Sequence, residues 1–170
     1  MSKEKVLILG VGNILLTDEG FGVRAVEYLE AQYRWPENVT LMDGGTQGLM
    51  LMSILMDCDF LVVLDVVLGR EAPGSIYLLE GEKLRQSLSF RDSMHQTDLV
   101  DTLVTCELAG HRPRALVFGM QPYDYKTMQV GLTSGAVAGF PDFAQNWYPS
   151  IVPVRLEPNY LSPRVAGLHS

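Results

Sequence analysis

Residues 60–67 read FLVVLDVV, an apolar run that is broken only by Asp65. A strand that is apolar on both faces is typical of a parallel sheet covered by helices on each side. Similar short apolar runs stand at residues 6–9, 39–42 and 115–119. The run at 60–67 therefore predicts a buried strand of an α/β domain.

Helical patterns alternate with these strands. Residues 22–33 place apolar side chains along one side of a helix, and residues 49–58 are apolar enough for a buried helix. Thr97 is a suitable N-cap for a further helix, in which Val104 and Leu108 fall on the apolar stripe. This alternation predicts a three-layer α/β/α sandwich with a mostly parallel central sheet of about five strands.

The remaining segments complete a single domain. Residues 75–79 follow an Ala-Pro-Gly turn and supply the fourth strand along the chain, and Thr133 is placed to cap a last helix. Prolines recur from about residue 149 onward, which predicts an irregular tail. Because no repeat and no linker divides the chain, residues 1–170 are predicted to form one domain.

Composition and charge exclude several classes of protein. The chain has 170 residues and a net charge of −7, with no cluster of basic residues, which argues against a nucleic-acid partner. The apolar stretch at residues 49–56 is far too short to span a membrane, and the run at 6–9 is too short for a signal-peptide core. Cys58 and Cys106 form neither a CxxC motif nor a disulfide framework. We therefore expect a cytoplasmic protein without a membrane partner.

Four polar residues are candidates for a site at the carboxyl edge of the sheet. Glu19 follows the first predicted strand, Asp43 ends the second, Asp65 ends the third, and His95 precedes the helix that begins near Thr97. Ligands of open α/β sheets bind outside the carboxyl ends of the strands. One histidine with two carboxylates suits a borderline divalent ion and leaves coordination positions open. A histidine and two carboxylates drawn from these four residues could therefore share a metal ion.

Each of these residues also has a structural interpretation. Asp65 can be a strand-end residue that caps a neighbouring loop. Glu19 can be a first-turn acid favoured by the helix dipole, with Thr17 or Asp18 as the N-cap, and His95 can be an exposed loop histidine. The residues alone leave these alternatives open.

A glycine-rich turn invites a nucleotide-binding interpretation. Gly10 and Gly12 follow a strand, but Leu15 stands where a dinucleotide fingerprint has its third glycine. The chain also has no HExxH and no GxSxG sequence, so neither the common zinc-peptidase motif nor the nucleophile elbow is present.

A family resemblance gives these motifs a common meaning. The sequence GVGNILLTDEGFGV at residues 10–23 resembles the opening signature of the NiFe-hydrogenase maturation proteases. Three further pieces follow in the expected order, namely DGGT at 43–46, the strand end at Asp65 and MHQ at 94–96. GLTS at 131–134 resembles the turn before the last helix of that family.

The resemblance implies an enzyme and a partner. It implies a hydrolase, an endopeptidase that removes the C-terminal extension of the NiFe-hydrogenase large-subunit precursor after nickel insertion. Glu19, Asp65 and His95 would contact the nickel that the precursor supplies, and other divalent metals could substitute for it. Asp43 could accept a proton or orient a ligand, as in an aspartic-type peptidase, although its Asp-Gly-Gly turn explains it equally well. The free protein is expected to be monomeric. The alternative is a non-catalytic chaperone that uses the same three residues to inspect nickel.

Overall fold

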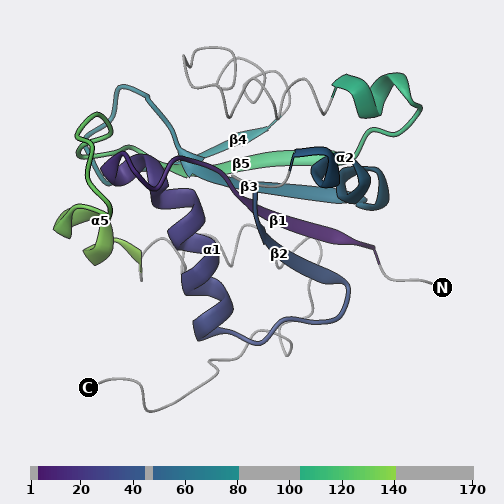
Figure 1. The fold of residues 1–170 in the computed structure, drawn as a ribbon, viewed down its shortest axis with the longest axis horizontal. Helices are drawn as coiled ribbons and strands as arrows, with labels where there is room; N and C mark the ends of the chain where they lie inside the picture. The colour runs from purple at the N-terminus through teal and green to yellow at the C-terminus, as the bar shows by residue number, and fades with distance from the viewer. Residues whose placement is uncertain (1–3, 45–47, 81–103, 141–170) are drawn as a thin grey trace.

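Five strands form one twisted sheet in the computed structural model, which describes residues 4–44, 48–80 and 104–140 (Figure 1). The strand order is β2-β1-β3-β5-β4. The first three pairs in this order are parallel, and β4 runs antiparallel to β5 at one edge. The strands are β1 (Val6–Gly10), β2 (Val39–Asp43), β3 (Phe60–Val66), β4 (Ile76–Glu80) and β5 (Arg114–Met120).

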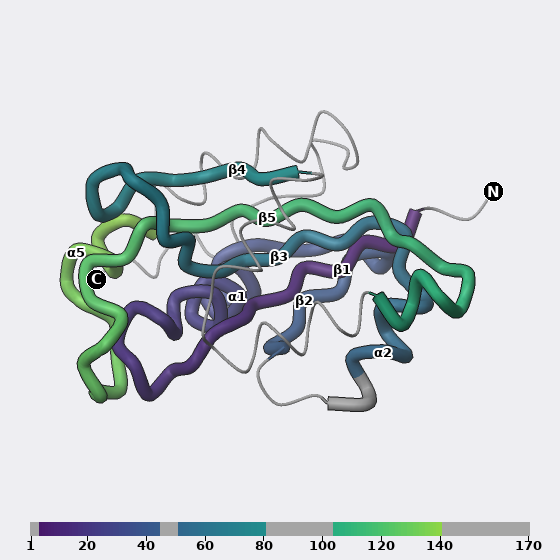
Figure 2. Tube along the Cα trace, turned by 90° about the horizontal axis from the view of Figure 1, so that it is seen from above, coloured from purple at the N-terminus to yellow at the C-terminus, as the bar shows by residue number. Residues whose placement is uncertain are grey.

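Helices cover both faces of this sheet. One face carries α1, and the opposite face carries α2, as the two views show (Figures 1 and 2). The helices are η1, a short 3-10 helix (Thr17–Gly20), α1 (Phe21–Gln32), α2 (Gly48–Asp57) and α5 (Ser134–Ala138), with a further helical segment at residues 104–108. The predicted α/β fold with a mostly parallel sheet of five strands is confirmed. No helix among the described residues is both long enough and apolar enough to cross a membrane.

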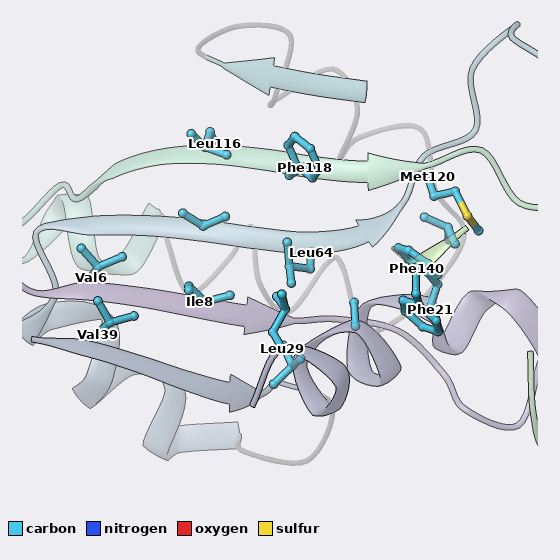
Figure 3. Packing of buried hydrophobic residues seen from close by; sticks show 14 of the residues in the cluster. Val6, Ile8, Phe21, Leu29, Val39, Leu64, Leu116, Phe118, Met120 and Phe140 are labelled. Atoms are coloured by element: carbon cyan, nitrogen blue, oxygen red, sulfur yellow. The ribbon is translucent and has the colours of Figure 1, made fainter. Parts of the chain in front are cut away.

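The central strand β3 explains why the core has two halves. All seven of its residues are buried. Val62, Leu64 and Val66 pack into the cluster under α1, part of which is drawn in Figure 3. Leu61 and Val63 instead join the cluster under α2. Burial on both faces follows from the continuous apolar run, because successive side chains of a strand point to opposite sides.

Three helix predictions met different outcomes. The helix expected at residues 22–33 is α1, and Thr133 is confirmed as the N-cap of α5, since its side chain accepts a hydrogen bond from the backbone of Ala136. The apolar stripe through Val104 and Leu108 was wrong as a guide to burial. Those side chains are 47% and 83% exposed, whereas Cys106 between them is buried. Residues 97–103 and the proline-rich tail lie outside the described residues.

The strand order places a switch point between β1 and β3. The chain leaves β1 through α1 to β2 on one side, and then passes through α2 to β3 on the other side of β1. Loops that follow β1 and β3 therefore diverge at their carboxyl ends, which is where open α/β sheets bind ligands. The predicted residues Glu19 and Asp65 belong to these two segments.

Candidate functional site at the carboxyl edge of the sheet

Asp65 is a buried carboxylate at the end of the central strand. It is the last residue but one of β3, and only 2% of it is exposed. Its Oδ1 accepts a hydrogen bond of 2.7 Å from the backbone N–H of Val66. By strand alternation it shares the α2 face of the sheet with Leu61 and Val63. Burial of a carboxylate among apolar side chains costs free energy unless the group is hydrogen-bonded, paired or bound to a metal. Asp65 is therefore a candidate for a functional residue.

The loop after β1 brings Glu19 to the same edge. Glu19 is half-buried in η1, and η1 packs against β3. Two glycines make this approach possible. Gly12 has a φ of +142°, and a Cβ on it would collide with the backbone oxygen of Glu19. A Cβ on Gly10 would likewise collide with the backbone of Gly22 at the start of α1. The two glycines that suggested a nucleotide motif thus have a packing role in this loop.

Asp18 is the residue that the sequence did not single out. It is fully buried, with 0% exposure. It was considered only as a possible N-cap, but Gly20 is the N-cap of α1 and no side chain caps either η1 or α1. Its carboxylate instead accepts hydrogen bonds from the loop that follows β5. Oδ2 accepts from the backbone N–H groups of Tyr123 at 3.0 Å and Asp124 at 3.1 Å.

The same carboxylate also binds the start of α5. Oδ1 of Asp18 accepts from the backbone N–H of Thr133 at 2.8 Å, and the Thr133 hydroxyl lies 2.9–3.0 Å from both carboxylate oxygens. In the other direction, the Asp18 N–H donates to the carbonyl oxygen of Asp124 at 2.9 Å. The acidic pair at 18–19 gave no sign of this difference, because only the tertiary fold decides which carboxylate turns inward.

Neighbouring contacts join the two loops along their length. The Thr17 hydroxyl donates to the carbonyl oxygen of Thr127 at 2.7 Å, and the Thr17 N–H donates to Gln129 at 3.0 Å. Asp124 organises its own turn, because its Oδ1 accepts from the N–H groups of Lys126 and Thr127. Hydrogen bonds from Thr127 and then Lys126 lower the pKa of the Asp124 carboxyl. The loops after β1 and β5 therefore form one connected rim.

Asp43 lies on the other side of β1. It is the exposed last residue of β2 and pairs in register with Gly10. Gly10 is also in register with Leu64, so Asp43 falls on the α1 face, whereas Asp65, one residue beyond Leu64, falls on the α2 face. The structure thus places both carboxylates at the carboxyl edge. They lie on β2 and β3, the two strands that flank β1, and point toward opposite faces of the sheet.

The third predicted metal ligand, His95, lies outside the described residues. Within residues 4–44, 48–80 and 104–140, no three His, Cys, Asp or Glu side chains are grouped closely enough to hold a metal ion. The described part of the chain supplies two carboxylates, on η1 and β3. Hard oxygen donors with one imidazole are a donor set that divalent nickel, zinc or cobalt accepts.

The two cysteines are poor candidates for a nucleophile. Both are free, buried and part of the core under α2. Burial, followed by the nearby charge of Asp59, raises the pKa of the Cys58 thiol to about 12, and burial also raises the pKa of Cys106. His111 contacts the backbone oxygen of Cys58, at 2.7 Å, rather than its sulfur. A thiol that stays protonated has little reactivity, since the thiolate is the nucleophile.

A cavity of about 740 Å³ lies at the opposite, amino edge of the strands. Its lining includes the start of β1, the loop before β2 and the end of α2, with the ion pair of Lys5 and Asp57 at 2.9 Å. Of the predicted site residues that the structure describes, Glu19, Asp43 and Asp65, none lines it. The buried carboxylates Asp18 and Asp65 instead lie at the carboxyl edge, which makes that edge the candidate site.

Comparison with known proteins identifies a family with the same fold. The family model described as "Hydrogenase maturation protease" matches residues 23–147. The chain is 38% identical over 131 residues to the "Hydrogenase 2 maturation protease" of Escherichia coli, which covers 76% of this chain and 79% of that protein. It is also similar to the structure of the "hydrogenase maturating endopeptidase HybD" from E. coli, with a TM-score of 0.81, 32% identity and coverage of 94% and 98% of the two chains.

A further relative is longer than the matched region. The "Hydrogenase expression/formation protein HoxM" of Azotobacter vinelandii is 43% identical over 124 residues, which is 72% of this chain. The match spans 60% of the length of that relative.

Proposed function

Because the chain belongs to the hydrogenase maturation protease family, we propose that it is an endopeptidase that removes the C-terminal extension of a NiFe-hydrogenase large-subunit precursor. One observation carries the proposal beyond family membership. A carboxylate that is 2% exposed ends the central strand at the switch point of the sheet, next to the turn that carries Glu19. Such a group is retained at a cost in stability, which is typical of a functional site.

Nickel is the recognition element in this proposal. The precursor supplies the ion after insertion, and Glu19, Asp65 and His95 provide the final contacts to it. Ligands of the precursor fill the ion's other coordination positions, so the protease alone binds nickel weakly. A precursor without nickel lacks the contact and is left uncut. Other divalent ions that accept carboxylate and imidazole donors can substitute for nickel.

The chemistry is the hydrolysis of one peptide bond. Water adds to the scissile carbonyl, the C–N bond breaks, and the released amine takes up a proton. We assign Asp43 the role of proton acceptor or of a residue that orients the substrate, because its carboxylate is exposed at the same edge. In this proposal the enzyme is an aspartic-type hydrolase of the cytoplasm that is monomeric when free.

The alternative is a chaperone that inspects nickel without cutting. Purified protein incubated with nickel-loaded and nickel-free precursor separates the two functions. The proposal expects the large subunit to shorten only when nickel is present, with the released peptide detected by mass spectrometry. Stable binding of the nickel-loaded precursor without shortening would support the chaperone. Equal shortening of both precursors would refute nickel recognition, but the proposed peptidase activity would stand.

A further inference from the structure

We propose that Asp18 is the positioning residue of this site, since it fixes the turn that presents Glu19 to the metal. The inference rests on the proposed function, because it concerns how Glu19 is held in place. Asp18 does not contact the substrate in this proposal. It acts through the backbone of its neighbour, and its partners belong to the loop after β5 and the cap of α5.

The hydrogen bonds around Asp18 require a carboxylate. Oδ2 receives the N–H groups of Tyr123 and Asp124, and Oδ1 receives the N–H of Thr133. Both oxygens thus accept from backbone donors that have fixed directions. An asparagine has the same shape but only one acceptor oxygen, so either of its orientations points an amide N–H₂ at a backbone N–H. Because Asp18 is 0% exposed, water cannot relieve that conflict.

Glu19 has little freedom between the two loops. Its N–H donates to the carbonyl oxygen of Leu16 at 3.0 Å, and its own carbonyl lies against Gly12. The preceding residue is held by four donors of the rim. Asp18 and Glu19 both belong to η1, which is only four residues long. A shift of the Asp18 carboxylate is therefore passed on to Glu19 rather than absorbed by the chain.

The arrangement also links two separated motifs. Thr133 belongs to the GLTS segment, and its hydroxyl lies 2.9 Å from Oδ2 of Asp18 while accepting from the N–H of Ala136 at 3.3 Å. One hydroxyl therefore connects the N-terminus of α5 with the turn of Glu19. This connection gives the threonine a role beyond capping a helix.

The test compares Asp18→Asn with a core variant at the other end of the sheet, where Ile54 and Asp57 beside Leu55 line the amino-edge cavity. Leu55→Ala removes a fully buried side chain under α2 and serves as the stability control. Processing of nickel-loaded precursor is measured for both at a temperature where circular dichroism shows each to be folded. We expect the rate of Asp18→Asn to fall on the order of 100-fold, as for a misplacement of a reacting group by about 1 Å, while Leu55→Ala keeps the wild-type rate.

A second pair of variants covers the case in which Asp18→Asn does not fold. Thr133→Val removes the hydroxyl and keeps the shape, whereas Thr133→Ser keeps the hydroxyl. We expect Thr133→Val to slow processing and Thr133→Ser to restore it. If Asp18→Asn or Thr133→Val processes precursor at the rate of Leu55→Ala, the positioning role is wrong. If the wild-type protein itself leaves nickel-loaded precursor uncut, the proposed function fails instead.

Discussion

Asp65 of β3 and Gly119 of β5 lie directly opposite each other in the parallel ladder, and a Cβ on Gly119 would come within 2.8 Å of the Asp65 backbone oxygen. It would also collide with the side chain of Val67. The close approach of β5 to the end of β3 therefore depends on the absence of a side chain at position 119. The position of the backbone that carries the buried carboxylate depends on this contact.

Gly119→Ala is expected to disturb both stability and processing. The new methyl group must displace β3 or Val67, which costs about 1–3 kcal/mol for an overpacked core position. Chemical denaturation measures the free energy of unfolding, and a processing assay reports the rate. The matched control is Gly139→Ala, where the nearest atom to a new Cβ is an ordinary 3.5 Å away. Equal behaviour of the two variants would show that the spacing beside Asp65 does not matter.

Asp65→Asn and His95→Ala are expected to leave the precursor uncut even when nickel is present. The asparagine keeps the shape and one oxygen but removes the charge, and the alanine removes a nitrogen ligand. Both variants should fold, which circular dichroism can verify. Asp57→Asn is the control, because its exposed carboxylate pairs with Lys5 at the other edge of the sheet. Full processing by the His95 variant at equal protein concentration would refute its contact with nickel.

Replacement of either cysteine by serine is expected to preserve processing. The pKa of Cys58 is raised to about 12, so the thiol is protonated at neutral pH and cannot act as a nucleophile. The folded protein should also react slowly with iodoacetamide and faster after denaturation. Loss of processing in a folded cysteine variant would require a covalent mechanism.

The buried Cys58 also predicts how stability changes in alkaline solution. Its pKa is about 12 in the folded protein, against an ordinary value of 9.0. Between these values the unfolded chain loses the thiol proton while the folded protein keeps it, so the free energy of unfolding falls as the pH rises. Below pH 9 the contribution is fully present. Urea denaturation at several pH values should show a smaller decline for Cys58→Ala, and equal slopes for both proteins would contradict the shift.

The sequence by itself determined the layers of the fold. The doubly apolar strand β3 had to be covered by helices on both faces, because a strand without a polar face cannot face water. Short strands that alternate with helical patterns then gave a mostly parallel sheet, and Thr133 was identifiable as a cap because local hydrogen bonding decides such a position. The short-range pattern also marked Asp65 as a carboxylate at a strand end and Glu19 as an acid in the loop after the first strand.

Only the tertiary structure decided what those carboxylates do. Asp18 and Glu19 are adjacent and chemically alike. Asp18 is nevertheless buried and accepts hydrogen bonds from donors more than 100 residues away in the sequence, while Glu19 stays half-exposed. The register alone placed Asp43 and Asp65 toward opposite faces. Periodicity predicted that Leu108 is buried, but Leu108 is exposed and Cys106 is buried instead. The reason is that burial at the end of a helix depends on which elements pack against it. Long-range contacts are absent from any local pattern, and these contacts determine which of two similar carboxylates is buried and which stays partly exposed.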